Sequence, residues 1–243
     1  MYRSAVSRGG SDLSSTNAAA AQLPAAGAPQ PIDNPPPSVI SQGALLPPRL
    51  RSNGTLRRLH EAALVRFGER GYHGVSIREL AEAAGVTVSS VYSHVSAKED
   101  LLAELMVVGH LEHNEWMRRA AEAAPEDPAS RMRAVVHAHV RVHATYPLLT
   151  RVCNKELHAL SPANAARVME VRHDSERLFL EVVEAGVAAE LFSCHDPWLA
   201  VAAIGGMGIR VSEWFDPRGP YAVDEVADAY AELALRMLCA GPG

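Results

Sequence analysis

The stretch from Ser76 to Leu101 constrains the fold of this chain more than any other part of its sequence. Glu79 follows Ser76 after three residues, which is the spacing of a capping box at the start of a helix. Gly85 can take the left-handed conformation that ends a helix, and Thr87 can then cap a second helix. Two short helices joined by a glycine-containing turn are typical of a helix-turn-helix, whose second helix enters the major groove of DNA.

Helices on both sides extend this motif into a larger unit. Ser96 and Glu99 repeat the capping-box spacing, which predicts a long helix that leaves the motif. Before the motif, apolar residues at three- and four-residue steps predict a helix from about 53 to 70. We therefore expect a three-helix DNA-binding head, of helix-turn-helix type, over residues 51–97.

The chain behind the head is also expected to be helical. A hydrophobic content of 48% is enough for a sizeable core, and no run of alternating β-branched residues indicates a strand. The fold class is therefore predicted to be all-α, with a six-helix domain over residues 98–243. Its helices are predicted from apolar periodicity and from proline positions, at about 98–123, 130–146, 147–160, 161–189, 197–215 and 224–239.

Residues 1–50 differ in composition from the rest of the chain. They hold half of the 16 prolines together with many alanines, which predicts a disordered tail that cannot build a core. No continuous apolar region follows its arginines, so a secretory signal is not expected. The 3 cysteines are far apart, and no apolar run reaches the length of a membrane span. We expect a cytoplasmic protein without a membrane partner.

The charge of the chain is unevenly distributed. A net charge of −5 does not by itself indicate a nucleic-acid-binding protein. Residues 51–105 carry equal numbers of basic and acidic side chains, so the excess acidity lies behind the head. Contact with DNA phosphates would therefore depend on where individual charges lie.

Candidate DNA-contacting residues gather on and around the second helix of the motif. Hydroxyl groups at a helix N-terminus can donate to phosphates, and short hydroxyl side chains can meet base edges. That helix has no arginine or glutamine for bidentate base reading, so specificity should depend also on dimer spacing and DNA shape. Lys98 is interpreted as a phosphate clamp. The candidates are Ser76, Arg78, Thr87, Ser89, Ser90, Tyr92, Ser93, His94 and Lys98.

Two other classes of function, a metal sensor and an enzyme, have weaker signals in the sequence. His139 and His143 lie four residues apart on one predicted helix, a spacing that lets two imidazoles share a metal. No complete ligand motif accompanies them, so neither a metal nor a cofactor is expected, and a metal-sensing regulator stays an alternative. No nucleophile motif such as G-x-S-x-G is present, so the chain is not expected to be an enzyme, and a helical enzyme domain is the remotest alternative.

The head carries a family pattern at Phe67, Gly71, Tyr72, Ile77, Ala81, Gly85, Val86, Tyr92, His94, Lys98, Glu99 and Leu101. With these residues it resembles the TetR-type transcriptional regulators over about residues 53–102. The resemblance implies a homodimeric, ligand-controlled repressor whose two heads bind a palindromic double-stranded DNA operator. One departure is Val95, which follows His94 where relatives usually have phenylalanine.

The C-terminal stretch GIRVSEWFDPRGPYAVDEVADAYAELALRML looks like the ligand domain of an actinobacterial subgroup with acyl-CoA-responsive repressors of fatty-acid and sterol catabolism. This resemblance implies that residues 98–243 bind a small apolar effector, of which an acyl-CoA is one candidate, and that they form the dimer. The effector would shift the helix that starts at Lys98 and thereby release the DNA. Ligand contacts are expected from Trp116, Val140, Leu149, Phe179 and Met207.

Glycines inside the predicted helix 197–215 need a reason, because each costs on the order of 1 kcal/mol relative to alanine. Either they allow close packing against a second helix, or they leave room for a ligand. The TetR resemblance implies that the last two helices form a four-helix interface with their mates. The expected dimerisation residues are Gly205, Gly206, Gly208, Trp214, Tyr230, Leu233 and Met237.

Overall fold

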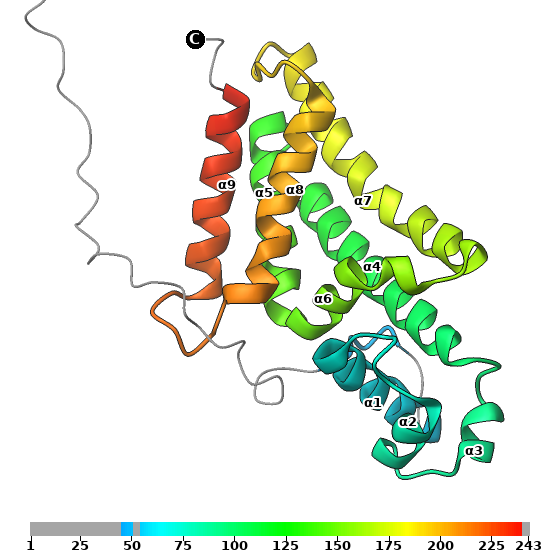
Figure 1. The fold of residues 1–243 in the computed structure, drawn as a ribbon. Coiled ribbons are helices and arrows are strands. Elements are labelled where there is room, and N and C mark those ends of the chain that lie inside the picture. The colour runs from blue at the N-terminus through cyan, green and yellow to red at the C-terminus, as the bar shows by residue number, and fades with distance from the viewer. Residues whose placement is uncertain (1–44, 51–53, 240–243) are drawn as a thin grey trace, which may run out of the picture. The chain divides into compact units, whose positions relative to one another are not determined.

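The structure is a computed structural model that describes residues 45–50 and 54–239 (Figure 1). The prediction of a disordered tail falls mostly on residues outside these ranges. Within them the regular secondary structure is helical throughout, which confirms the all-α prediction. The elements are α1 (Gly54–Arg70), α2 (Ile77–Ala83), α3 (Val88–Tyr92), α4 (Lys98–Ala123), α5 (Pro128–Thr145), α6 (Pro147–Lys155), the short 3-10 helix η1 (Leu157–Ala159), α7 (Pro162–Ala188), α8 (Pro197–Trp214) and α9 (Val223–Cys239).

Helices α1, α2 and α3 form the predicted head, and the expected capping interactions hold α2 in place. The Ser76 side chain accepts a hydrogen bond from the Glu79 N–H at 3.2 Å, while Glu79 Oε2 accepts from the Ser76 N–H at 2.7 Å. Gly71 and Gly85 have φ values of 72° and 66°, the left-handed conformation that glycine adopts without strain. The chain therefore ends α1 and makes the turn after α2 where the sequence predicted it.

The start of α4 differs from the prediction. Ser96 and Glu99 do not form a capping box; instead Asp100 Oδ2 accepts hydrogen bonds from the N–H groups of Ser96 and Ala97 at 2.9 and 2.8 Å. Glu99 points away from this cap and accepts from the Ser161 hydroxyl, 2.7 Å away, at the beginning of α7. Two adjacent carboxylates thus have different roles, since Asp100 caps α4 and Glu99 joins α4 to α7.

The packed part of the chain begins before the predicted boundary at residue 51. Leu46 is 1% exposed and Leu50 is also buried, both in the core cluster that contains the head helices. Arg49, between them, pairs with Glu112 and Glu115 in the middle of α4 at 3.4 and 4.0 Å. Residues 45–50 therefore belong to the folded unit, because Leu46 and Leu50 gain a buried apolar site and Leu45 packs against the same core.

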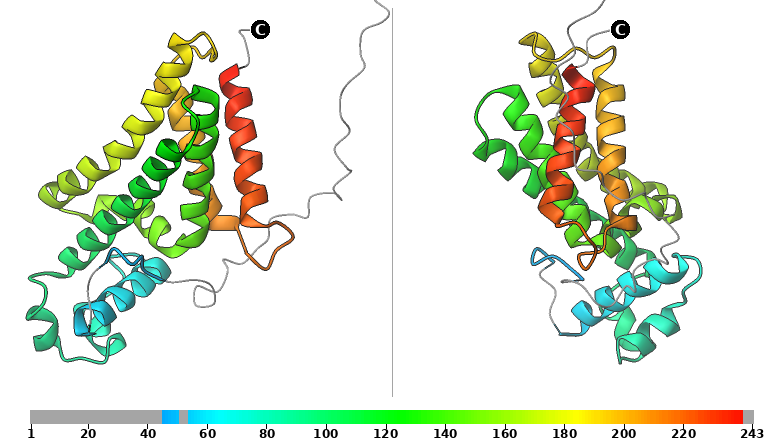
Figure 2. Two further views of the ribbon diagram at one scale, coloured as in Figure 1. Left: turned by 180° about the vertical axis from the view of Figure 1, so that it is seen from behind. Right: turned by 90° about the vertical axis from the view of Figure 1, so that its left-hand side faces the viewer.

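The domain behind the head is built around α5, which packs against α4, α7, α8 and α9. Helices α8 and α9 run beside each other on one face of this domain (Figure 2, right). Proline at the first turn of α5, α7 and α8 starts these helices, and Asp127 and Asp196 cap two of them. No helix among the described residues is both long and apolar enough to cross a membrane.

The capping box makes a testable contribution to stability. Replacement of Ser76 by alanine should lower the free energy of unfolding by about 1 kcal/mol, because an N–H group at the start of α2 loses its acceptor. Urea denaturation followed by circular dichroism measures the change. Ser89→Ala is the matched control, since Ser89 is exposed and its hydroxyl makes no hydrogen bond to the described residues. Equal losses in the two variants would contradict the capping role.

Candidate functional site

Six of the predicted DNA-contacting residues, from Thr87 to His94, lie on α3 or directly beside it, whereas Ser76, Arg78 and Lys98 lie at the starts of α2 and α4. Val91 faces inward and is fully buried, whereas Ser89, Tyr92 and His94 are exposed to solvent. Val95 is also buried in the core of the head, so it fills the apolar position that follows His94. The packing of two valines thus orients the polar side of this short helix outward, at the edge of the head seen in Figure 1.

The hydroxyl groups of this surface differ in how they are engaged. Thr87 Oγ1 accepts from the Ser90 N–H at 3.2 Å and caps α3, and Ser93 Oγ donates to the Ser90 carbonyl at 2.7 Å. The side chains of Ser89, Ser90, Tyr92 and His94 make no hydrogen bond with the described part of the chain. These four are the side chains most available for a DNA partner.

Two predicted contacts lie at the start of α2. The Ser76 hydroxyl donates to Glu79 Oε2 at 2.8 Å, so it is already part of the capping box. The hydrogen bonds from Ser76 and from Arg70 lower the pKa of Glu79 to about 2, which keeps this carboxylate charged. Arg78 is exposed and has no ion pair within the described ranges. Of the two candidates, Arg78 therefore has the freer group for a phosphate.

The interpretation of Lys98 as a phosphate clamp is not supported. Its ammonium group donates to the backbone carbonyls of Tyr72 and Val75 at 2.8 and 2.7 Å and lies 3.9 Å from the centre of the Tyr72 ring. Partial burial lowers the pKa of Lys98. Two of its three N–H donors are thus used within the head, where Lys98 fixes the loop between α1 and α2 to the start of α4.

Hydrogen bonds connect the head to the domain behind it. His60 on α1 donates from Nε2 to Glu104 on α4 at 2.7 Å, and the Tyr72 N–H donates to Glu156, after α6, at 3.1 Å. Within the domain behind the head, Glu99 on α4 accepts hydrogen bonds from Ser161 at the start of α7. The head therefore contacts α4 directly and the chain at the end of α6, while these bonds reach α7 only through α4, so a movement of α4 or α6 would change the position of the head.

A cavity of about 580 Å³ lies among α4, α5, α6, α7 and α8. The apolar part of the lining comes mainly from α8, with Phe179 and Leu180 of α7, while histidines from α4 and α5 and charged side chains of α7 form the polar part. The lining residues are Gly109, His110, His113, His139, His143, Thr150, Cys153, Asn154, Arg172, His173, Ser175, Glu176, Arg177, Phe179, Leu180, Trp198, Val201, Ala202, Gly205, Gly206 and Ile209. Its size suits a small organic molecule or one part of a larger one.

Only Phe179 of the five predicted ligand contacts lines this cavity. Trp116 borders a different hollow and bonds to Glu112, while Val140 and Leu149 are buried in separate core clusters. Met207 packs against the core around Met117 rather than into the cavity. Apolar periodicity marks inward-facing residues, but it does not tell a filled core position from a cavity wall, because both are apolar.

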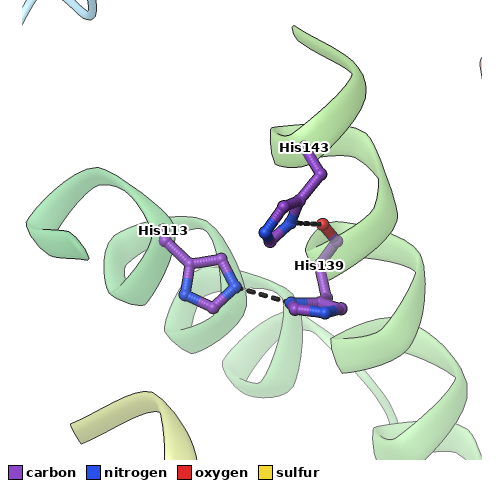
Figure 3. Close-up of side chains that lie close together, drawn as sticks. All are labelled: His113, His139 and His143. Atoms are coloured by element: carbon purple, nitrogen blue, oxygen red, sulfur yellow. Dashed lines mark hydrogen bonds between the residues drawn. The ribbon is translucent and has the colours of Figure 1, made fainter. Parts of the chain in front are cut away.

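The polar part of the lining contains three histidines whose side chains meet (Figure 3). His113 on α4 and His139 on α5 are joined by a bond of 2.7 Å between Nε2 and Nδ1. His139 Nε2 also donates to the Gly205 carbonyl on α8 at 3.0 Å, and His143 Nδ1 donates to the His139 carbonyl at 2.8 Å. Burial lowers the pKa of His139 to about 4 and the pKa of His113 and His143 well below the ordinary value of histidine, so all three are neutral at pH 7. The four-residue spacing predicted the pair of His139 and His143, but it did not include His113. The only indication for His113 in the sequence was its closeness to His110.

The three glycines of α8 have different surroundings. Gly205 and Gly206 line the cavity, and a Cβ atom at either position would have open space around it. Gly208 is buried, and a Cβ there would collide with the His139 ring. The prediction that Gly208 lies at a dimer interface is therefore wrong, since its missing side chain makes room for a histidine of the same chain.

The remaining dimerisation candidates lie on α8 and α9. Leu233 and Met237 are exposed on α9, with fractions of 45% and 42%, whereas Trp214 and Tyr230 are half-buried and pack against each other. Leu233 and Met237 are four residues apart and therefore share one face of α9, and neighbouring exposed apolar side chains of this kind favour contact with a partner. The contact of these residues with a second chain stays a prediction.

Two families of known proteins match this chain. Residues 59–105 match the family described as "Bacterial regulatory proteins, tetR family", and residues 125–238 match the family described as "Tetracyclin repressor-like, C-terminal domain". The chain is 26% identical over 203 residues to the HTH-type transcriptional repressor KstR2 of Rhodococcus jostii (strain RHA1). The match covers 83% of this chain and 95% of that repressor.

Solved structures give the same result. A bacterial regulatory protein in the tetR family from Rhodococcus RHA1 is 32% identical to this chain, with a TM-score of 0.72. The match covers 78% of this chain and 100% of the solved chain. AibR in complex with isovaleryl coenzyme A and operator DNA matches with a TM-score of 0.66 at 22% identity, covering 76% of this chain and 98% of that chain. The second likeness shows a shared fold.

The glycines of α8 offer a matched pair of substitutions. Gly206→Ala should raise the free energy of unfolding by up to about 1 kcal/mol, because alanine favours a helix and the site is open. Gly208→Ala should lower it by about 1–3 kcal/mol, because the added methyl group displaces the His139 ring. Urea denaturation of both variants measures the difference, and two changes of the same sign would contradict the assigned packing.

Proposed function

We propose that this chain, which belongs to the TetR family of bacterial regulatory proteins, is a homodimeric repressor that an acyl-CoA releases from a palindromic operator. The observation that carries the proposal is the cavity beside α4, because the same helix is bonded to the DNA-binding head. A molecule in the cavity and a DNA duplex at α3 would thus compete for the position of one rigid element.

The DNA partner is proposed from the exposed side of α3. Ser89, Ser90, Tyr92 and His94 offer hydrogen-bonding groups, and Arg78 adds a positive charge nearby. Short hydroxyl groups discriminate weakly between bases, so the spacing of two heads and the shape of the operator supply the remaining specificity. Two heads on adjacent major grooves require half-sites about 34–36 Å apart.

The effector is proposed from the two parts of the cavity lining and from a relative. Phe179, Leu180 and Val201 form an apolar surface for an acyl chain, while Arg172 and Arg177 place two guanidinium groups at the same cavity. A coenzyme A thioester combines an apolar acyl group with phosphates, which arginine binds well. The structure of AibR with isovaleryl coenzyme A shows that a protein of this fold holds such a ligand.

Release of DNA would follow from a shift in population. Ligand binding moves the equilibrium only if the ligand prefers one position of the helices that line the cavity. Gly109, His110 and His113 of α4 line it, and Glu104 of the same helix holds His60 of the head. An acyl-CoA that displaces α4 would therefore displace the head as well.

The alternatives receive less support. The relatives described above are transcriptional regulators, which does not favour an enzyme, and we propose that the chain has no catalytic activity. None of those relatives is described as a metal sensor, so the metal-sensing alternative gains no support from them. The site of action is proposed to be the cytoplasm, where operator DNA is accessible.

DNase footprinting on the region upstream of the gene for this chain tests the proposal. We expect a protected palindrome that is lost on addition of short- to medium-chain acyl-CoA.

Tyr92→Ala should weaken operator binding by about 10-fold or more, because an exposed α3 contact worth roughly 1–3 kcal/mol is removed. Tyr221→Ala is the matched control, since both tyrosines are 54% exposed but Tyr221 precedes α9. No protected site at moderate salt would overturn the repressor function.

The dimer is tested through α9. The double variant Leu233→Glu and Met237→Glu should be monomeric, because two buried charges per chain would face each other across an apolar contact. Val187→Glu, an exposed position on α7, is the control and should stay dimeric. Light scattering measures the mass, and a dimeric double variant would exclude this face of α9 from the interface.

A further inference from the structure

The three meeting histidines have a defined hydrogen pattern. The Gly205 carbonyl can only accept, so His139 carries its hydrogen on Nε2 and leaves Nδ1 as an acceptor. His113 must then donate from Nε2 to His139 Nδ1. The His139 carbonyl fixes the hydrogen of His143 on Nδ1 in the same way, which leaves His143 Nε2 with a free lone pair. Two of the three rings therefore already present an unprotonated nitrogen to their neighbours.

This pattern is the one that metal-binding histidines use. A coordinating imidazole is neutral, and its second nitrogen usually donates to a carbonyl or carboxylate that fixes the ring. His139 and His143 both satisfy this requirement through backbone carbonyls before any ion is bound. One nitrogen from each of His113, His139 and His143 lies within 4.8 Å of the others, and all three side chains are buried.

A second observation points to a bound group at the same place. His110, one turn before His113 on α4, lines the cavity and is buried, but its Nε2 has no hydrogen-bond partner among the described residues. A buried polar atom without a partner costs free energy unless a water, an ion or a ligand satisfies it. The histidine cluster thus borders a space in which a further polar group is expected.

We propose that His113, His139 and His143 bind one divalent transition-metal ion of the zinc type, with a fourth position open to the cavity. Three histidines and one open position are a common zinc arrangement, and imidazole also suits cobalt, nickel and copper. Zinc lies about 2.0–2.1 Å from each nitrogen, so His113 and His139 must separate slightly from their contact of 2.7 Å. The hydrogen on His113 Nε2 moves to Nδ1, which keeps the ring neutral.

The ion would join three helices. His113 belongs to α4, His139 and His143 belong to α5, and the Gly205 carbonyl that orients His139 belongs to α8. The proposal concerns metal binding itself, and an organic molecule remains the proposed effector. The open position faces the cavity, where it can take a water molecule or an oxygen of that effector.

Cobalt spectroscopy on the full-length protein, after removal of metal with a chelator and dialysis, tests the site. One equivalent of Co²⁺ should give the visible absorption of a tetrahedral nitrogen site, and Zn²⁺ should abolish it. Calorimetry with Zn²⁺ should show one ion per chain. His113→Ala and His143→Gln should each weaken Zn²⁺ binding by more than the roughly 10–100-fold that loss of an outer-sphere partner costs.

A control variant and a folding check make the result decisive. His173→Ala removes an exposed histidine that lines the same cavity outside the cluster, and it should bind Zn²⁺ like the parent protein. Thermal unfolding monitors the fold of each variant, and His143→Gln keeps most of the side-chain volume. Absence of the cobalt spectrum, or equal Zn²⁺ binding by all variants, would overturn the metal site. Neither result would affect the operator footprint, so the repressor function is tested independently.

Discussion

Helix α4 is packed into two hydrophobic cores at once, and the connection between the two parts of the molecule depends on this constraint. Its first turns bury Leu101, Leu102 and Leu105 against the head, and Met117 near its other end is buried in the core around α5 and α7. Close-packed interiors resist independent movement of their parts. The helix therefore cannot shift at one end without rearranging contacts at the other.

Hydrogen bonds also fix the orientation of α4 relative to the elements around it. Lys98 holds the loop before α2, Glu99 reaches the start of α7, and Glu104 accepts from the buried His60 of α1. Each bond joins α4 to a different element, so they fix both its rotation and its position along its own axis. The head is thus a rigid extension of the domain that contains the cavity.

The histidine cluster shows how a cavity can be polar in the middle of an apolar domain. Neutral imidazoles satisfy one another and two backbone carbonyls, so that burial does not leave a charge without a partner. Gly208 contributes by its missing side chain, since a Cβ atom there would occupy the place of the His139 ring. A helix-destabilising glycine is thereby explained by a neighbour on another helix.

The sequence by itself determined the features that depend on residues close together in the chain. The capping box of Ser76 and Glu79, the left-handed Gly71 and Gly85, and the all-α fold follow from local spacing, because helix caps and turns are local interactions. The tertiary structure decided the rest: the internal role of Lys98, the position of Glu99 at α7, the cavity wall and the meeting of His113 with His139. These contacts join residues far apart in the chain, and periodicity records only which face of a helix turns inward, not which helix it meets.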